Sequence, residues 1–492
     1  MKDLKERAIR GGFAKMCAQG ANYALRIGTL AIMARLLSPK DFGLVGMVTA
    51  FTGVLSLFRD FGLSAATVQH VDITEDQIST LFWINVLVGL LLTLLTVGMA
   101  PVAVAFYHEP GLFWVTIALG SAFLVNAIGV QHSALLQRQM RFSALATIDV
   151  ITWALSNGAG ILMAATGFRY WSLVVSTASM PLISTLCLWV VTGWIPGRPR
   201  TGVGLRSMMR FGSGLTVTGL IVYVAYNFEK VLLGRFWGAD AVGLYGRAYQ
   251  LSTIPVDNLN SSVGEVAFSA LSRVKNDPPR FRSYFLKGYS LVLVMTIPTT
   301  IAVALFAPEL ISALLGPKWK DAASIFRLLA PTILVFALIN PIGWLIFSLG
   351  MVGRSLKVAL VLAPVMICGY VTGLPYGPKG VALAYSTVMV LWVVPHIAWG
   401  VHGTVVSFRD IALTASRPLI SGIVAGAVTL AALLAWGESL HALPRLLLGL
   451  ALLVSVYFGM LFYVMGQKTV YVKLFRDILR GSAVEEESLV PA

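Results

Sequence analysis

Residues 10–46 read RGGFAKMCAQGANYALRIGTLAIMARLLSPKDFGLVG, and a second copy of this stretch begins at Arg210. The copies align without a gap at an offset of 200 residues. The identical positions are Arg10, Gly12, Tyr23, Arg35, Gly43, Leu44 and Gly46, which recur as Arg210, Gly212, Tyr223, Arg235, Gly243, Leu244 and Gly246. Apolar composition alone does not align arginines and glycines in this way. A repeat of this length in an apolar chain indicates a transporter built from two bundles around a site.

The composition of the 492-residue chain indicates a membrane protein. Hydrophobic residues make up 57% of it and charged residues only 12%, and its mean hydropathy is +0.81. This leaves too little polar surface to cover a soluble globule of this size. Apolar runs that can cross a hydrocarbon layer of about 30 Å recur along the whole length. We therefore predict an all-α polytopic membrane protein, with no cleavable signal peptide at its start.

Charged and Gly/Pro-rich breaks divide the apolar runs into about 14 transmembrane spans. The spans lie near residues 12–36, 42–60, 79–106, 112–136, 144–166, 170–194, 210–234, 241–264, 284–307, 322–348, 355–374, 379–401, 411–435 and 442–466. Because the repeat begins at the first and the seventh span, we predict two parallel six-helix lobes with pseudo-twofold symmetry, followed by two extra C-terminal helices.

The same pattern predicts domain boundaries. The predicted parts are an N-terminal lobe (1–197), an inter-lobe connector (198–209), a C-terminal lobe (210–401), the extra helices (402–466) and a basic amphipathic segment with an acidic tail (467–492). The tail segment has the pattern of a helix that lies on an anionic leaflet.

The formal net charge of +15 comes from Lys and Arg residues that are scattered among short loops. They form no continuous basic domain, which argues against nucleic acid as a partner. An even number of spans places both termini on one side, and the loops and tails of that side hold most of the 37 Lys and Arg residues. The positive-inside rule therefore predicts that both termini are cytoplasmic. Cys17, Cys187 and Cys368 lie in apolar runs and imply no disulfide.

Ionisable groups inside spans are costly in hydrocarbon and mark candidate functional residues. Arg26 lies midway along the first span, and Glu229 and Lys230 lie in the later half of the seventh. Arg35 and Arg235 end these two spans on the predicted outer side. We predict that Arg26, the deepest, faces a cavity. The other three cations either face the same cavity or extend their side chains to the membrane interface.

Asp149 in the fifth span and Asp257 in the eighth are candidates for coupling to ions or protons, and Glu229 is a third. Helix pairing or capping is an equal alternative for the two aspartates. The chain contains no GxxxxGK[ST] loop, no HExxH pattern and no GxSxG motif. We therefore expect no catalytic residue, no metal and no cofactor, and a transporter rather than an enzyme.

Two motifs carry a family resemblance. Ala34-Arg35-Leu-Leu-Ser-Pro-Lys-Asp-Phe-Gly43-Leu44 is followed by Phe58-Arg59-Asp60-Phe61-Gly62-Leu63. Together they resemble the start of polysaccharide transporters of the multidrug/oligosaccharidyl-lipid/polysaccharide (MOP) flippase superfamily, and residues 234–245 resemble the corresponding part of their second lobe. The chain is most similar to the Wzx-type, colanic-acid-exporter-like branch.

The resemblance implies a function. Such proteins move undecaprenyl-diphosphate-linked oligosaccharides across the bacterial inner membrane by alternating access, for exopolysaccharide or O-antigen synthesis. Their cationic cavity implies that Arg26, Arg35, Lys230 and Arg235 face the diphosphate. A planar guanidinium suits that role because it binds phosphate oxygens in pairs. The implied partners are the lipid-linked oligosaccharide, membrane lipids, and a polysaccharide polymerase and chain-length regulator.

Two other functions stay open. An ion-coupled multidrug antiporter on the same fold should have an acidic central cavity, which the cations on the first and seventh spans disfavour. A membrane-embedded polysaccharide polymerase generally needs a large outer loop or a carboxylate-rich cytoplasmic domain. The longest predicted outer connection, around residues 308–321, is short.

Overall fold

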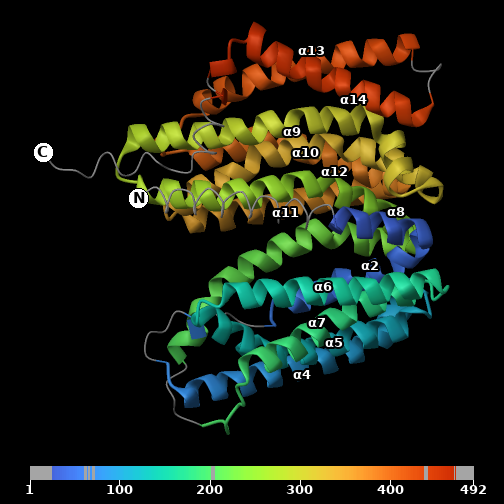
Figure 1. The fold of residues 1–492 in the computed structure, drawn as a ribbon, viewed down its shortest axis with the longest axis vertical. Coiled ribbons are helices and arrows are strands. Elements are labelled where there is room, and N and C mark those ends of the chain that lie inside the picture. Colours follow the sequence, from blue (N-terminus) through green and yellow to red (C-terminus); the bar gives the residue numbers. More distant parts are fainter. Residues whose placement is uncertain are drawn as a thin grey trace, which may run out of the picture. The chain divides into compact units, whose positions relative to one another are not determined.

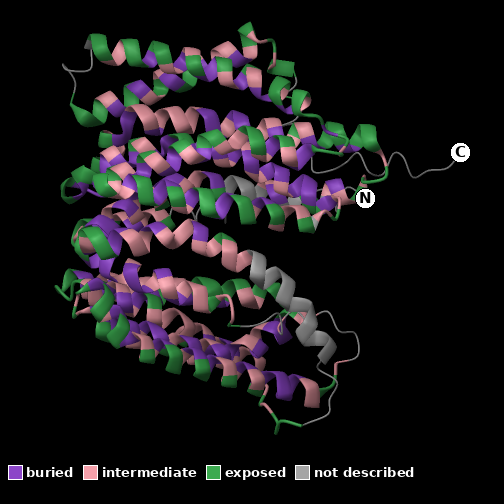
Figure 2. Cartoon of the chain, turned by 180° about the vertical axis from the view of Figure 1, so that it is seen from behind, coloured by how far each residue is buried: buried purple, intermediate pink, exposed green. Residues whose placement is uncertain are grey.

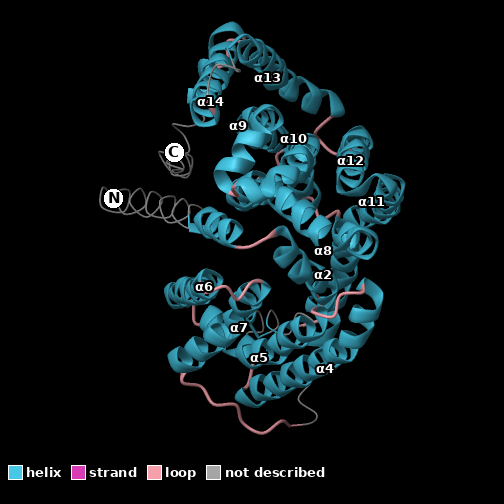
Figure 3. Cartoon of the chain, turned by 90° about the vertical axis from the view of Figure 1, so that its right-hand side faces the viewer, coloured by secondary structure: helices cyan, strands magenta, loops and turns pink. Residues whose placement is uncertain are grey.

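The computed structural model describes residues 25–59, 64, 67–68, 73–200, 206–436, 441–469 and 471–472. Over these residues the chain is helical with short loops, and it contains no strand (Figure 3). Nine helical segments in this part of the chain are long and apolar enough to cross a membrane. The first half of the first predicted span, with Gly12, Cys17 and Tyr23, lies outside the described residues, as do Arg10 before it and nearly all of the predicted tail segment 467–492.

The helices follow the predicted spans (Figure 1). They are α2 (Pro39–Ser56), α4 (Glu75–Tyr107), α5 (Leu112–Arg138), α6 (Phe142–Ala165), α7 (Tyr170–Thr192), α8 (Arg206–Arg273), α9 (Pro278–Leu314), η1 (Pro317–Trp319), α10 (Lys320–Ser348), α11 (Val352–Gly373), η2 (Leu374–Tyr376), α12 (Gly377–Val401), α13 (Phe408–Trp436), α14 (Ala442–Gly459) and η4 (Met460–Val464). Residues 25–36 are also helical. The all-α polytopic prediction is confirmed.

Two kinks make the number of helices approximate. The backbone of α8 leaves helical geometry at Gly238, between the seventh and eighth predicted spans. Its φ of 79° and ψ of −175° lie in a region that is open almost only to glycine. The backbone of α9 departs from helical geometry at Phe306, two residues before Pro308. Proline removes a helical hydrogen bond there, which accounts for the kink.

Local sequence sets several helix ends. Ser38 precedes α2 and its hydroxyl accepts a hydrogen bond from the Asp41 backbone, while the Asp41 carboxylate accepts one from the Ser38 backbone at 2.9 Å. Thr74 and Gln77 form the same reciprocal capping pair at the start of α4. Each pair satisfies two backbone N–H groups that have no partner inside the helix. At its other end α4 stops at His108, whose backbone is left-handed.

The chain forms two compact units. Unit 1 comprises Met1–Ala31, Tyr249–Arg354 and Met389–Ala492, and unit 2 comprises Ile32–Ala248 and Ser355–Val388. The helix α8 therefore contributes its first part to unit 2 and its second part to unit 1. The lobes predicted from the repeat, 1–197 and 210–401, are a different division of the chain and stay a prediction.

Unit 1 has an aromatic core on α9. Its fully buried rings include Phe281, Phe285 and Tyr289, and Tyr457 of α14 joins the same cluster. The helix α9 contacts α10, α13 and α14. At the start of α13, Asp410 pairs with Arg282 of α9 through both carboxylate oxygens, and the Arg282 Nε to Asp410 Oδ2 distance is 2.8 Å.

Unit 2 is a bundle in which α5 contacts α4 and α7, and α7 contacts α6 (Figure 1). Leu136, Ile148 and Leu188 of α5, α6 and α7 form a small buried cluster. Exposed residues occur along the whole length of the helices (Figure 2), and on α4 they include Leu87, Leu91 and Leu94. Apolar side chains that face outward along a long helix are typical of contact with lipid.

The two repeat copies meet inside unit 2. A Cβ added to Gly43 of α2 would lie 1.7 Å from the carbonyl oxygen of Ala239, and one added to Gly243 of α8 would lie 1.9 Å from that of Pro39. At the offset of 200 residues, Gly43 is equivalent to Gly243 and Pro39 to Ala239. The contact is therefore reciprocal, as twofold-related elements require. Glycine at both positions allows the two backbones to touch.

Residues 194–200, here called the strap, follow α7 and lie along the first turns of α4. Trp83 Nε1 donates to the Gly197 carbonyl at 2.8 Å, and the Gly197 amide donates to Ser79 Oγ at 3.0 Å. The Arg200 amide donates to Thr80 Oγ1 at 3.1 Å, and its guanidinium pairs with Asp76 at 2.6 Å. The beginning of the predicted connector is therefore fixed to α4.

Candidate functional site

One group of cations lies where α4 ends. The Arg235 guanidinium of α8 lies 2.8 Å from His108 Nδ1 and 5.6 Å from the centre of the Phe106 ring. On the neighbouring helix, Lys40 pairs with Glu109 at 3.3 Å. Arg247 stacks over the Phe42 ring of α2 at 4.1 Å. The first turn of α2, the C-terminal end of α4 and the bend of α8 therefore meet in a cation-rich cluster. This cluster includes the predicted residue Arg235.

Two other predicted residues, Glu229 and Lys230, precede Arg235 on α8 by more than one helical turn. Lys230 is half-buried and donates to the Asn227 amide oxygen at 2.6 Å. Glu229 is 1% exposed, and neither of its carboxylate oxygens has a hydrogen-bond partner among the described residues. A buried carboxylate without a partner is costly as an anion, and a proton or a bound cation relieves that cost.

The other predicted residues are dispersed. Arg35 is exposed in unit 2, and Arg26 is exposed in unit 1. Asp149 is exposed on α6, three residues before Thr152, and Asp257 is exposed on the part of α8 that belongs to unit 1. The structure thus groups Arg235 with the end of α4 and places Lys230 beside Asn227. A common diphosphate cavity for Arg26, Arg35, Lys230 and Arg235 stays a prediction.

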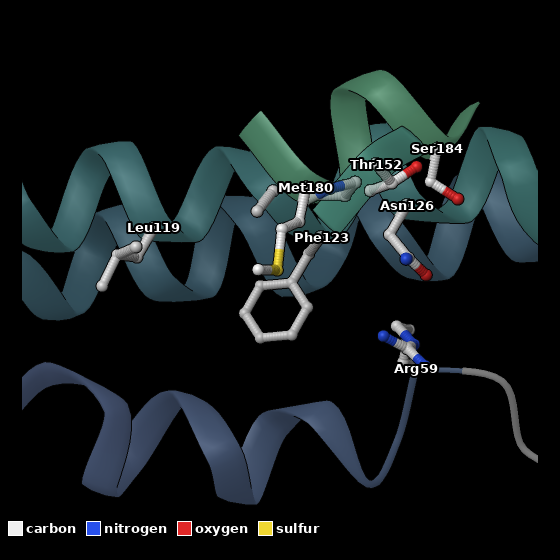
Figure 4. Close-up of a pocket in the computed structure, with 9 residues that line it drawn as sticks. Arg59, Leu119, Phe123, Asn126, Thr152, Met180 and Ser184 are labelled. Carbon is white, nitrogen blue, oxygen red and sulfur yellow. The ribbon is translucent and has the colours of Figure 1, made fainter. Parts of the chain in front are cut away.

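A polar pocket, here called the Arg59 pocket, lies inside unit 2. It has a volume of about 350 Å³ and is lined by Arg59, which follows α2, and by residues of α5, α6 and α7. Its polar lining residues are Arg59, Asn126, Thr152 and Ser184. Figure 4 shows the Arg59 guanidinium and the Asn126 amide pointing toward one another across the pocket. Leu119, Phe123 and Met180 supply its apolar wall.

The pocket lies at mid-depth of its helices. Asn126 is 14 residues from the first residue of α5 and 12 from the last, so it lies roughly 20 Å from either end. Thr152 and Ser184 are likewise interior residues of α6 and α7. A guanidinium at such a depth faces a wet cavity far more readily than it faces lipid. Among the residues that the structure describes, no carboxylate lines the pocket and no acidic residue forms an ion pair with Arg59.

Two lining groups have free hydrogen-bonding capacity. The Asn126 Oδ1 and Thr152 Oγ1 atoms are buried and find no partner among the described residues. Buried polar atoms normally have partners, so these two are suited to bonds with a bound molecule. A cation beside unsatisfied amide and hydroxyl groups is the chemistry that binds an anionic, hydroxyl-rich headgroup. The described residues contain no cluster of ligands for a metal ion.

The sequence interpretation missed Arg59 because it placed this residue at the end of the second span, in a loop. Thr67, further along the chain, is fully buried and donates to the Gln131 amide oxygen at 3.0 Å. Arg138, at the end of α5, donates to the Thr67 carbonyl at 3.0 Å. Thr67 therefore lies beside the last turns of α5. The signal available was the motif Phe58-Arg59-Asp60-Phe61-Gly62-Leu63, which supported the family resemblance.

The sequence is similar to that of known polysaccharide biosynthesis proteins. The sequence profile of the family described as polysaccharide biosynthesis protein matches residues 32–324. The teichuronic acid biosynthesis protein TuaB of Bacillus subtilis (strain 168) is 29% identical over 331 residues, which cover 66% of this chain and 68% of TuaB. The lipopolysaccharide biosynthesis protein WzxC of Escherichia coli (strain K12) is 24% identical over 360 residues, 72% of each chain.

The fold is similar to that of a solved membrane transporter. The lipid II flippase MurJ, in an inward closed conformation, superposes with a TM-score of 0.70 and 14% sequence identity. The superposition covers 90% of this chain and 99% of the MurJ chain. At this level of identity the likeness concerns the fold. It agrees with the predicted MOP superfamily architecture.

Proposed function

This chain belongs to the polysaccharide biosynthesis protein family, and from that premise we propose that it is a flippase for a polyprenyl-diphosphate-linked oligosaccharide. Its similarity to proteins named for teichuronic acid and lipopolysaccharide biosynthesis, and its flippase fold, support this substrate class. Family and fold are those of a multi-pass membrane transporter and not of an enzyme. The product would serve exopolysaccharide or O-antigen synthesis, where a polymerase and a chain-length regulator would act on it.

The observation that carries the proposal is the Arg59 pocket. A diphosphate carries about two negative charges, and a guanidinium can bind two of its oxygens at once. Asn126 and Thr152 offer hydrogen bonds to the first sugar. The volume of about 350 Å³ lies within the range of ligand sites, about 300–1,000 Å³. We propose that the diphosphate and its first sugar occupy this pocket midway through transport.

The four predicted cations would act before and after this step. If both termini face the cytoplasm of an inner membrane, the end of α4 faces outward. Arg26 would then meet an incoming headgroup, and Arg35, Lys230 and Arg235 would meet a departing one. Reporters fused after residue 40 and after residue 200 test this orientation, because they should lie on opposite sides with residue 200 in the cytoplasm.

Glu229 is the strongest candidate for coupling. Its carboxylate is buried and has no partner in the described part of the chain. Gain of a proton or a cation would therefore remove the large free-energy cost of a buried anion, and its loss would restore that cost. Asp149 and Asp257 are exposed and weaker candidates. Glu229→Gln keeps the shape and abolishes the titration. We expect this variant to bind substrate normally and to lose most of the stimulation of transport by an imposed ion or proton gradient. Full stimulation would exclude Glu229 from coupling.

A reconstituted system tests the function directly. Vesicles that contain the protein and a fluorescent polyprenyl-diphosphate oligosaccharide are treated with a membrane-impermeant quencher, which reports the leaflet of the probe. We expect Arg59→Ala to slow flipping by about 10- to 100-fold, the effect of losing a charge-assisted contact worth about 1.5–3 kcal/mol. Arg59→Lys should recover part of the rate because it restores the charge without the planar fork.

Arg198→Ala is the matched control, because Arg198 is exposed in the strap and lies outside the pocket. It should flip at the normal rate. A normal rate for Arg59→Ala would exclude the Arg59 pocket from the transport path. Transport of organic cations by the wild-type protein, with no flipping of the lipid probe, would instead support the antiporter alternative.

A further inference from the structure

We propose that His108 and Arg235 form a proton-linked binding site for a diphosphate group, in which the His108 imidazole gains a proton as the anion binds. This inference rests on the proposed function and deepens it, because it adds a second anion site and a dependence on pH. Both residues belong to unit 2, and both side chains are exposed. Water, protons and a headgroup can therefore reach them.

The geometry of the contact fixes the protonation state of His108. Its Nδ1 atom lies 2.8 Å from a nitrogen of the Arg235 guanidinium. A guanidinium has only donors, so Nδ1 is the acceptor and carries no proton in this contact. The imidazole is therefore neutral and occupies one N–H group of Arg235. Imidazole is also the side chain that changes its charge between about pH 5 and pH 8.

The packing of α4 against α8 holds the two side chains together. Tyr107 is buried against Gly234, where an added Cβ would lie 2.6 Å from the tyrosine ring. These two residues directly precede His108 and Arg235 in the chain. The Arg235 guanidinium also stacks on the Phe106 ring, and the left-handed backbone of His108 ends α4. The two groups therefore stay close to one another when the imidazole becomes a cation.

The surrounding groups do not neutralise a second cation. The neighbouring carboxylate, Glu109, is already paired with Lys40 of α2 at 3.3 Å. Arg247 of α8 adds a further cation to the same cluster. Asp240 of α8 is exposed and forms no ion pair with another described residue. The first turn of α5, which packs along α4, contains no acidic or basic residue.

A bound anion removes the conflict between two adjacent cations. An imidazolium repels a guanidinium beside it, whereas a diphosphate placed between them accepts hydrogen bonds from both. The proton comes from the aqueous phase at the end of α4 and binds to Nδ1 of His108, which then donates to a phosphate oxygen. Arg235 regains the N–H group that it had donated to the imidazole. Proton and anion thus raise each other's affinity by the same factor.

Phosphate groups reach this place from two sources, the substrate and the headgroups of anionic lipids. A diphosphate carries about two negative charges and has enough oxygens to bridge two cations, whereas a phosphodiester headgroup carries about one charge. The substrate is therefore the ligand that makes use of both cations, and the experiment compares the two sources.

Calorimetry with a soluble diphosphate diester tests the site. The probe is UDP-glucose, whose diphosphate keeps its charge over the pH range used. The parent protein is the full chain in phosphatidylcholine nanodiscs with Arg59→Ala and Glu229→Gln, which remove the cation of the Arg59 pocket and the buried carboxylate. We expect binding to be about fivefold tighter at about pH 5.5 than at about pH 8, the effect of an exposed charge pair. Binding near the midpoint should take up roughly 0.4 proton, the amount that a fivefold linkage requires.

Variants of His108 separate a titrating role from a structural one. His108→Gln keeps an acceptor for Arg235 and cannot gain a proton, so its affinity should be the same at both pH values and its proton uptake should vanish. His108→Lys carries a permanent cation and should bind tightly at both, a gain that loss of folding cannot produce. His402→Gln is the matched control, because His402 is exposed in unit 1, and it should keep the fivefold difference.

Two results would overturn the proposal. One is a parent protein that binds UDP-glucose without proton uptake, and the other is a His108→Gln variant that keeps the pH dependence.

Glycerophosphoglycerol, the soluble headgroup of phosphatidylglycerol, represents the lipid source in the same assay. We expect it to bind at least about fivefold more weakly than UDP-glucose at about pH 5.5, because it has one charge fewer. Equal affinity with equal proton uptake would assign the site to lipid headgroups and overturn the assignment to the diphosphate.

This inference and the proposed function fail in different ways. Binding of UDP-glucose requires no flipping, so a loss of proton linkage beside normal flipping by the wild-type protein would remove the His108–Arg235 site and leave the flippase function in place. If the wild-type protein does not flip the lipid-linked probe, the proposed function itself is wrong, whatever calorimetry shows for UDP-glucose.

Discussion

Residues 38–46 and residues 238–246 occupy equivalent positions in the two repeat copies, and in each the backbone bends before the next helical segment continues. In the first copy the bend is set by side chains, because Ser38 and Asp41 form a capping pair and Pro39 begins α2. In the second copy the bend is set by the backbone of Gly238, with a φ of 79°. The same change of direction is thus encoded by two unrelated local devices.

The glycines show where the symmetry matters. Gly43 and Gly243 both lie against the backbone of the opposite copy. Gly46 would place a Cβ 3.1 Å from Val242, whereas a Cβ on the equivalent Gly246 would meet open space. The copies are therefore matched at their point of closest approach and differ one turn further on. Sequence identity between repeats marks equivalence of position, and only the packing shows which identities are needed.

The largest effect should come from Gly43→Ala and from Gly243→Ala. Each added methyl group would overlap a backbone carbonyl, which cannot rotate away as a side chain can. We expect each variant to lose most of its flipping activity. Its free energy of unfolding should fall by about 1–3 kcal/mol, the cost that is typical of overpacking, or by more. Thermal unfolding in detergent and the vesicle assay measure the two effects.

Gly246→Ala is the control for this pair. It lies on the same helix and its Cβ would meet nothing within 4 Å, so the variant should be unaffected or slightly stabilised. If Gly43→Ala behaves like Gly246→Ala, the close contact between the copies is not required.

A smaller effect is expected from Gly238→Ala. The φ and ψ of Gly238 are costly for any residue with a Cβ, by about 1–3 kcal/mol. The unfolding temperature should fall by the corresponding amount. Gly238→Asn should be no more stable than Gly238→Ala, because asparagine tolerates the left-handed helical region but not the φ and ψ of Gly238. Unchanged stability for both variants would show that the second copy can bend without glycine.

The smallest effect should come from Ser38→Ala. This change removes the cap of α2 and should cost about 1 kcal/mol. Pro39 and the Lys40–Glu109 ion pair remain, so the helix should still begin at the same residue. Ser121→Ala is a suitable control, because its hydroxyl bonds only within α5. A loss larger than that of Gly238→Ala would reverse the comparison between the two bends.

Much of the fold could be predicted from the sequence. The thickness of the membrane sets the length of a span, and each apolar run can be recognised from consecutive residues alone. The repeat also pointed to the residues that form the reciprocal contact at Gly43 and Gly243. The helix ends at Ser38 and Thr74 are of the same local kind, since a capping pair involves residues only three apart.

The candidate site was predicted less well, because a pocket depends on which helix faces come together. Arg59 looked like a loop residue, and only its position beside Asn126 of α5 places it at mid-depth (Figure 4). The complete burial of Glu229 also depends on packing around α8. Charge within a span can be read from sequence, whereas its exposure and its partners cannot.

The fixation of the strap to α4 restricts how far the start of α8 can travel. Arg200 is held by Thr80 and Asp76, and only residues 201–205 separate it from the first residue of α8. Six Cα-to-Cα steps reach at most about 22 Å when fully extended. As long as the strap stays in place, every conformation of the transport cycle must keep the beginning of α8 within that radius. The length of this tether therefore sets an upper limit on the amplitude of the motion.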